Sequence, residues 1–242
     1  MLKLLHRRAG GDLFVDYGWG SLIFTDDGDM QEVSYHLHQA DWHREDMEAL
    51  GPLLERGDTA VDVGANIGFV SLMLASLVGP DGTVVALEPS KRTFAKLTRT
   101  IEKNGLAGVV RALNVGCGAE PGEARLRQVS GSSGNATMVG AAAGAGAEDV
   151  ALVRLDDLEI GSRVALVKID TEGFEAEALK GAGRLLREDR PTIFIELGGH
   201  YLDSTLEAIA LLADAGYDVE RLRGIDWESV GNGANFVVRP AA

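Results

Sequence analysis

The residues with the clearest chemical meaning lie where an apolar run ends in Asp62 and enters a turn with Gly64 and Gly68. A buried strand that leads through such a turn into a helix can bind a nucleotide-type ligand at the turn. Pyrophosphate-binding turns need G-x-G-x-x-G, whereas this chain has Gly64-x-x-x-Gly68. The Asp62 carboxylate would repel a pyrophosphate and suits a ligand that carries ammonium and sulfonium cations. The segment therefore predicts S-adenosylmethionine rather than a nicotinamide dinucleotide.

A second carboxylate, Glu88, ends the next apolar run. A carboxylate at this place can accept hydrogen bonds from both ribose hydroxyls of an adenosine-containing cofactor. Glu88 alone does not distinguish one such cofactor from another, but together with Asp62 and the glycine turn it favours S-adenosylmethionine. The simpler alternative is a glycine turn that only packs a helix on a strand.

Three candidates for proton transfer follow two later apolar runs. Methyl transfer requires a positioned acceptor and, for a hydroxyl, a group that takes its proton. Asp170 ends one run and is the first candidate for this base or for orienting the acceptor, with Glu172 next. His200 follows the other run, and its neutral imidazole could also accept a proton. The alternatives are a carboxylate that caps a helix or braces a loop and a histidine on a surface loop.

Metal binding is a further hypothesis for this part of the chain. Asp170, Glu172 and Glu196 could hold a hard divalent cation such as Mg²⁺ through oxygen ligands. His36 and His38 would share a face of a strand, but the surrounding sequence predicts no strand there, so we do not expect zinc.

The elements that must position these residues form an alternating pattern. Nearly continuous apolar runs are each followed by a helical pattern, which predicts a doubly wound α/β fold with a mostly parallel sheet. Two closing strands are predicted near the end of the chain, and one strand at this edge is antiparallel. The predicted strands are 59–63, 83–88, 109–115, 164–170, 192–197, 217–222 and 235–239.

Two helices have clear end signals. One is predicted over 91–104, with Ser90 as its N-cap and Gly105 as its stop. The other is predicted to begin at the capping box 204–207 and to end at Gly216. Its predicted inner face consists of Leu206, Ile209, Ala210 and Ala213.

Two regions break the alternation. Residues 1–50 predict a small N-terminal cap, with strands at 13–17 and 21–25 and a helix from about His43 to Arg56. Residues 51–242 then form the main domain. The Gly/Ala/Ser-rich segment 131–146 predicts a loop that could serve as a lid.

Taken together, these blocks resemble the FkbM family of methyltransferases, in order, over roughly residues 45–240. The matching segments are Asp62–Gly68, Leu87–Pro89, Val153–Leu158, Val167–Glu175 and Pro191–Leu197. The resemblance implies a Rossmann-like class I domain that uses S-adenosylmethionine to methylate a hydroxyl on a sugar or natural-product small molecule.

The resemblance also implies a set of cofactor contacts. These come from Asp62, Gly64, Asn66, Gly68, Glu88, Gly116 and Asp170. The chain departs from the family where an acidic residue often follows a small one after Gly116, since Cys117 stands there instead. Backbone groups near Gly116 or the side chain of Glu120 would then replace the adenine contact.

Composition narrows the classes of protein. The chain has 242 residues, is 45% hydrophobic and carries a formal net charge of −14, which disfavours binding to a nucleic acid. No apolar stretch reaches the roughly 18 residues of a membrane-spanning helix, and the basic start lacks a secretory signal, so we expect a cytoplasmic protein. Cys117 is the only cysteine, which excludes an internal disulfide. The sequence leaves open whether the protein forms a homo-oligomer.

Alternative functions remain at this point. A nicotinamide-dependent oxidoreductase would share the fold but would need the phosphate-binding glycines that the chain lacks. A domain that binds S-adenosylmethionine without turnover is the other alternative. Amino-methylation of nucleic acid is disfavoured, because Asp170-Thr171-Glu172-Gly173 stands where an Asn/Asp-Pro-Pro-aromatic motif is expected.

Overall fold

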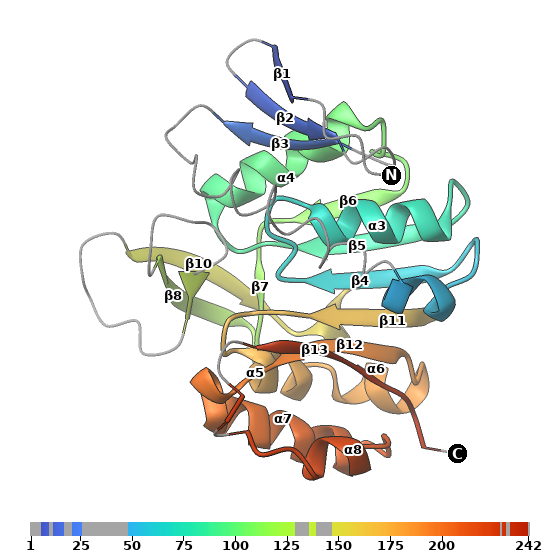
Figure 1. Cartoon of the computed structure of the whole chain (residues 1–242), viewed down its shortest axis with the longest axis vertical. Coiled ribbons are helices and arrows are strands. Elements are labelled where there is room, and N and C mark those ends of the chain that lie inside the picture. The colour runs from blue at the N-terminus through green and yellow to red at the C-terminus, as the bar shows by residue number, and fades with distance from the viewer. Residues whose placement is uncertain are drawn as a thin grey trace.

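The centre of the molecule is a six-stranded sheet in the order β13-β12-β11-β4-β5-β6 (Figure 1). The computed structural model describes residues 6–9, 12–16, 21–25, 48–128, 136–138, 147–227, 229–230 and 233–241. The sheet consists of β4 (Thr59–Val63), β5 (Thr83–Leu87), β6 (Val110–Leu113), β11 (Val164–Ile169), β12 (Thr192–Leu197) and β13 (Ala234–Val238). All are parallel except β13, which pairs antiparallel with β12. The predicted doubly wound fold with an antiparallel closing strand is thus confirmed.

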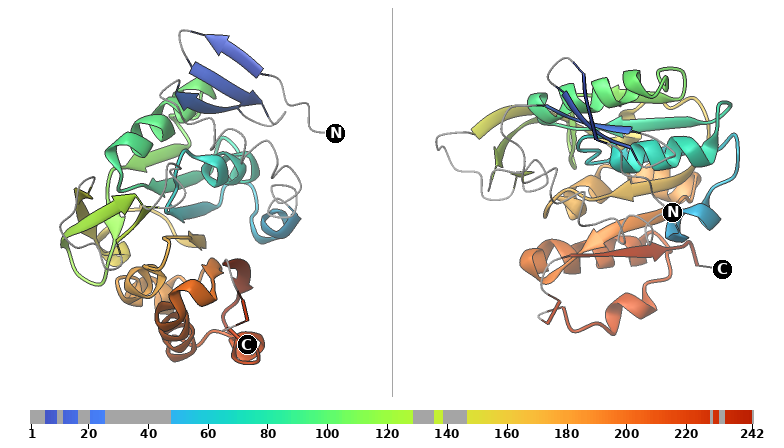
Figure 2. Two further views of the ribbon diagram at one scale, coloured as in Figure 1. Left: turned by 60° about the vertical axis from the view of Figure 1, so that its left-hand side comes forward. Right: turned by 45° about the horizontal axis from the view of Figure 1, so that its top comes forward.

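Helices cover both faces of this sheet (Figures 1 and 2). One face packs against α3 (Phe69–Val78) and α4 (Lys91–Lys103). The other packs against α5 (Glu175–Lys180), α6 (Gly183–Glu188), α7 (Leu202–Asp214) and α8 (Glu220–Arg223). Successive strand residues alternate between the two cores, so Ala60 faces α3 while Val61 faces the opposite layer. Burial on both faces explains the continuous apolar runs.

One predicted closing strand is wrong. Over 217–222 the structure has a single bridge between Tyr217 and Pro240, followed by the short helix α8. The side chain of Asp218 accepts a hydrogen bond from the backbone N–H of Glu220 and turns the chain into that helix. The Tyr217 hydroxyl donates to the carbonyl oxygen of Pro191, so its burial serves a side-chain contact rather than a strand.

The predicted ends of α4 are confirmed, but the start of α7 is not. Ser90 accepts a hydrogen bond from the backbone N–H of Thr93, and Gly105 adopts a φ of 67° just after the helix. Helix α7 begins at Leu202, before the predicted capping box. Its buried face consequently differs: Leu206 is 50% exposed. The buried residues of α7 are Thr205, Ala208, Ile209 and Leu212.

A second sheet, which the sequence did not predict, stands beside the first. It has the order β7-β10-β8-β9. Its strands are β7 (Gly116–Cys117), β8 (Gly122–Gln128), β9 (Ala136–Thr137) and β10 (Ala147–Val153). Most of the predicted loop 131–146 lies outside the described residues, apart from 136–138, where β9 pairs with β8.

The N-terminal strands form a separate three-stranded antiparallel sheet. It consists of β1 (His6–Ala9), β2 (Asp12–Asp16) and β3 (Ser21–Thr25). Strand β3 lies against α4 (Figure 2). Of the predicted helix over 43–56, the described part is helical at 48–50 and continues as η1 (Gly51–Leu53), ending at extended Leu54. His36, His38 and His43 lie outside the described residues, and the division at residue 50 stays a prediction.

Candidate active site

The topology of the sheet defines where a ligand can bind. From β4 the chain builds the sheet outward through β5 and β6 on one side, whereas β11 and β12 lie on the other side. Ligands of open α/β sheets bind outside the carboxyl ends of the strands at such a switch point. Leu87, Val63, Ile169 and Ile195 are partners in this order across β5, β4, β11 and β12. The next residues, Gly64, Glu88, Asp170 and Glu196, therefore form one row along this edge.

The turn after β4 is packed tightly against the end of β11. Gly64 has a φ of 76°, and a Cβ at this position would overlap the backbone carbonyl oxygen of Asp170. Gly68 has a φ of 97°, and its Cβ would lie 2.8 Å from the Leu97 side chain on α4. Both glycines are thus required by packing within the protein, and the same packing fixes the backbone of the turn.

Glu88 and Asn66 face each other across this turn. The Glu88 carboxylate accepts hydrogen bonds from the backbone N–H groups of Asn66, at 3.0 Å, and Ser90, at 2.9 Å. Burial raises the pKa of Glu88 to about 7 despite these two bonds. Asn66 has a φ of 51°, and within the described part of the chain its buried Oδ1 has no hydrogen-bond partner. A ligand donor at this position would satisfy that oxygen.

Asn114 braces the same region from β6. Its Nδ2 donates to the carbonyl oxygens of Glu88 and Pro89, each at 2.9 Å. The bonds fix the backbone that carries Glu88. Sequence reasoning missed this residue, although a polar amide directly after a strand is a recognisable signal for a loop contact.

Asp62 lies near the end of β4, as predicted, but its side chain points into the protein. Its side chain is fully buried on the α3 side of the sheet, so it has no exposed surface with which to contact a cofactor. Ser71 on α3 donates to its Oδ2 at 2.6 Å, and the ammonium of Lys168 lies 3.2 Å from its Oδ1. A direct contact of Asp62 with ligand cations stays a prediction, which this burial does not support. A strand-end carboxylate can point inward as easily as outward, and here it is neutralised by a lysine of the same protein.

Lys168 is the second residue that sequence reasoning missed. It is the lateral partner of Asp62 in the register of β4 and β11, and its side chain is only 5% exposed. Its Nζ donates to the carbonyl oxygen of Gly64 at 2.7 Å and lies 3.5 Å from Oδ2 of Asp170. The signal was a lysine inside an apolar strand, because buried lysines are rare unless they are paired.

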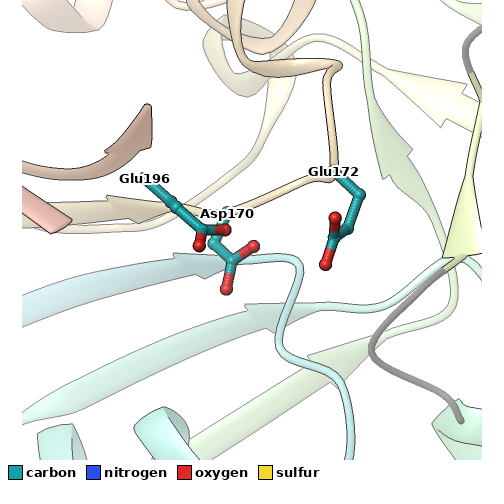
Figure 3. A group of neighbouring side chains, drawn as sticks. All are labelled: Asp170, Glu172 and Glu196. Atoms are coloured by element: carbon teal, nitrogen blue, oxygen red, sulfur yellow. The ribbon is translucent and has the colours of Figure 1, made fainter. Parts of the chain in front are cut away.

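Three carboxylates converge just beyond β11 and β12 (Figure 3). Asp170, Glu172 and Glu196 each offer an oxygen within 4.8 Å of the others. The negative charge of Asp170, followed by burial and a hydrogen bond between the two side chains, raises the pKa of Glu196 to about 9. Burial and the neighbouring charges raise the pKa of Glu172 to about 7. The three carboxylates thus lie close enough for the metal hypothesis, which stays a prediction, and the pair of Asp170 and Glu196 can share one proton.

The loop that carries Glu172 is held by Glu175. One oxygen of this buried carboxylate accepts hydrogen bonds from the backbone N–H groups of Thr171 and Gly173 and from the Thr171 hydroxyl, at 3.0–3.1 Å. Its other oxygen accepts from Ser204 at 3.3 Å. Glu172 has a φ of 54°, a conformation that residues other than glycine rarely adopt and that this network supports.

The remaining predicted residues lie farther from the acidic cluster or at the edge of the site. His200 is exposed on η4 (Gly199–Tyr201), beyond the end of β12. Gly116 is buried in β7, where a Cβ would lie 2.9 Å from the side chain of Leu152 in the second sheet. Glu120 is exposed. Roles for these residues stay predictions.

The sheet order, the covering helices and the row of strand-end residues define a class I methyltransferase fold of the Rossmann-like type. The profile described as the Methyltransferase FkbM domain matches residues 62–219. The chain therefore belongs to the FkbM methyltransferase family, as its sequence motifs predicted.

Known proteins are similar to this chain in sequence or in fold. The chain is 29% identical to Methyltransferase sdnD of Sordaria araneosa over 201 residues, which are 69% of this chain and 76% of that protein. It shares its fold with fibrillarin of Aeropyrum pernix in complex with S-adenosyl-L-methionine, at a TM-score of 0.51, 11% identity and coverage of 99% and 100% of the two chains. The corresponding values for TYW2 of M. jannaschii in complex with AdoMet are 0.52, 14%, 98% and 87%.

The described residues contain no helix that is long and apolar enough to cross a membrane.

Proposed function

We propose that the protein is an S-adenosylmethionine-dependent methyltransferase that methylates a hydroxyl oxygen of a small molecule, either a sugar or a natural product. The observation that carries the proposal is the row of Gly64, Glu88, Asp170 and Glu196, which puts a nucleoside-type site beside a carboxyl pair able to take a proton. Membership of a methyltransferase family supports it. Two proteins with the same fold bind S-adenosylmethionine at their own sites.

The residues on the β4 and β5 side suit an adenosyl cofactor. Each Glu88 oxygen accepts one backbone N–H, which leaves lone pairs for ribose hydroxyls. The unpartnered Oδ1 of Asn66 suits a hydroxyl or ammonium donor of the ligand. Asp62 supports the site from behind, through Lys168, and is not proposed as a direct contact.

The residues on the β11 and β12 side suit proton transfer. S-adenosylmethionine supplies a methyl group already activated by its sulfonium. An acceptor oxygen forms the new bond to that methyl carbon while the sulfur–carbon bond breaks and its electron pair stays on sulfur. We assign the hydroxyl proton to Asp170, which lies 3.5 Å from the Lys168 ammonium and has Glu172 and Glu196 adjacent. His200 remains an alternative acceptor of the proton.

The carboxylate cluster also suits a divalent cation, because three oxygen ligands within 4.8 Å of one another match the preference of Mg²⁺. Lys168 favours the site without a metal, because its ammonium already supplies beside Asp170 the positive charge that a cation would bring. We therefore keep Mg²⁺ as the alternative that chelation tests.

The proposal is tested by binding and then by activity. Calorimetry with S-adenosylhomocysteine should give a saturable site, whereas NAD should give none. A screen of hydroxylated sugars and natural products with methyl-labelled S-adenosylmethionine should then transfer label to oxygen. Binding of NAD without S-adenosylhomocysteine would overturn the cofactor assignment, and label found only on nitrogen, carbon or nucleic acid would overturn the acceptor class.

A further inference from the structure

We propose that Lys168 is a positioning residue that ties the cofactor turn to Asp170, so that buried Asp62 acts on the site only through this lysine. The inference rests on the proposed function and goes beyond it by assigning a role to a residue between the two halves of the site. Lys168 lies under the row of strand-end residues, on the face of the sheet that α3 covers.

Lys168 combines hydrogen bonds with ion pairs. Its Nζ donates to the Gly64 carbonyl oxygen at 2.7 Å and to that of Val63 at 3.4 Å. It also forms ion pairs with Asp62 at 3.2 Å and with Asp170 at 3.5 Å. The group is thus held from the turn, from β4 and from β11 at once.

The charge of Lys168 is secured by the same neighbours. Burial opposes it, but the carboxylates of Asp62 and Asp170 outweigh this effect and hold the pKa of the lysine above its ordinary value. Asp62 is fully buried and would be left as an uncompensated charge without the lysine. Asp62 and Asp170 together keep a cation at this position.

The geometry is more specific than charge neutralisation requires. A lysine that served only Asp62 would need neither the 2.7 Å bond to the Gly64 carbonyl nor the approach to Asp170. Gly64 also packs directly on the Asp170 carbonyl, so the turn and the end of β11 are in contact. Lys168 therefore fixes two things together: the backbone that faces the cofactor and the side chain that faces the acceptor.

The first test measures cofactor affinity with charge-balanced variants. Lys168→Met alone would strand Asp62, so the main variant is Asp62→Asn with Lys168→Met, which removes both buried charges. We expect it to bind S-adenosylhomocysteine roughly tenfold or more weakly by calorimetry, the scale of losing hydrogen bonds from a charged donor, with a cooperative thermal transition retained. Asp62→Asn alone keeps the bonds of Lys168 to Gly64 and Asp170 and should lose less.

Lys180→Met is the matched control. Lys180 also bridges two carboxylates, Glu177 and Glu207, but it does so on the surface, between α5 and α7. Combined with Glu177→Gln, its replacement removes one paired positive and negative charge, as the main variant does, and should leave affinity unchanged. An affinity of the folded double variant equal to that of the wild type, or a loss already complete in Asp62→Asn, would overturn the cofactor arm of the proposal.

The second test is a mutant cycle on turnover, with an acceptor identified by the screen. If Lys168 acts through Asp170, the paired substitution should lower kcat in the wild-type background but add little once Asp170→Asn is present. Equal effects in both backgrounds would overturn the link to Asp170. Wild-type protein that fails to bind S-adenosylhomocysteine would overturn the proposed function and this inference with it, whereas normal wild-type binding with unaffected variants overturns the inference alone.

Discussion

Two strand-end carboxylates in the same row, Glu88 and Glu196, are both harder to ionise than a free glutamate, but for different reasons. Burial is the main cause at Glu88, whose oxygens are each held by a backbone N–H. The charge of Asp170 is the main cause at Glu196. In the proposed function, the backbone bonds hold Glu88 as a fixed acceptor for hydroxyls, whereas the carboxyl pair at Glu196 exchanges a proton. We therefore propose recognition on one side of this sheet edge and proton handling on the other.

The largest effect should come from the proton-handling side. Asp170→Asn keeps the size of the side chain and removes the basic oxygen, so we expect turnover to fall by about 10²-fold or more. S-adenosylhomocysteine affinity should stay near that of the wild type, and steady-state kinetics with calorimetry would measure the two quantities. Normal turnover would move the base to Glu172, Glu196 or His200.

A smaller effect, on cofactor binding rather than on turnover, should come from the recognition side. Glu88→Ala removes the acceptor for the ribose hydroxyls and should weaken cofactor binding by about 1–3 kcal/mol, the usual scale for hydrogen bonds to a charged group. Once cofactor saturates the variant, its kcat should remain close to the wild-type value. Titration calorimetry measures the first quantity, and an unchanged affinity would remove Glu88 from the cofactor site.

The pH dependence of stability should separate the two sides further. The folded protein keeps protons on Glu88 up to a pKa of about 7 and on Glu196 up to about 9, whereas unfolded glutamates release theirs near 4.5. Because the native state binds more protons within this window, the free energy of unfolding should fall as pH rises from 4.5 toward 9. Glu196→Gln should flatten the upper part of that decline in thermal melts. A melting temperature that rises across this window in the wild type would contradict the assignment.

The smallest effect should come from chelation. If Lys168 supplies the positive charge beside Asp170, turnover in the presence of EDTA should equal that of the untreated enzyme. The measurement is a turnover assay before and after dialysis against EDTA, with Mg²⁺ added back. Loss of activity that Mg²⁺ restores would show that the proton-handling side is a metal site and that Asp170 is not the base.

Much of the fold followed from the sequence because buried parallel strands leave a direct trace. β4 and β12 have their predicted bounds, and the glycine turn and the carboxylate cluster lie at the expected strand ends. The second sheet was not predicted, since β8 is mostly exposed, β10 has a single buried residue, and both strands carry charged residues among the apolar ones.

The environment of Asp62 and the start of α7 were not predicted because both depend on residues far apart in the sequence. Sequence position shows that Asp62 ends a strand but not which residue lies beside it, and its partner Lys168 is far along the chain. Helix α7 is a second example. Ser204 contacts Glu175 and does not cap the helix, which begins at Leu202. Long-range pairing decided both outcomes.

The contact between Gly64 and the Asp170 carbonyl also bears on how such an enzyme can diversify. A side chain at Gly64 would displace the strand end that carries the candidate base, so a substitution at Gly64 would disturb the cofactor turn and Asp170 together. New acceptors are best sought by altering segments outside this junction and beyond Gly116, such as β8 and β10 of the sheet inserted between β6 and β11. A library confined to these two strands should alter acceptor preference while leaving cofactor use intact.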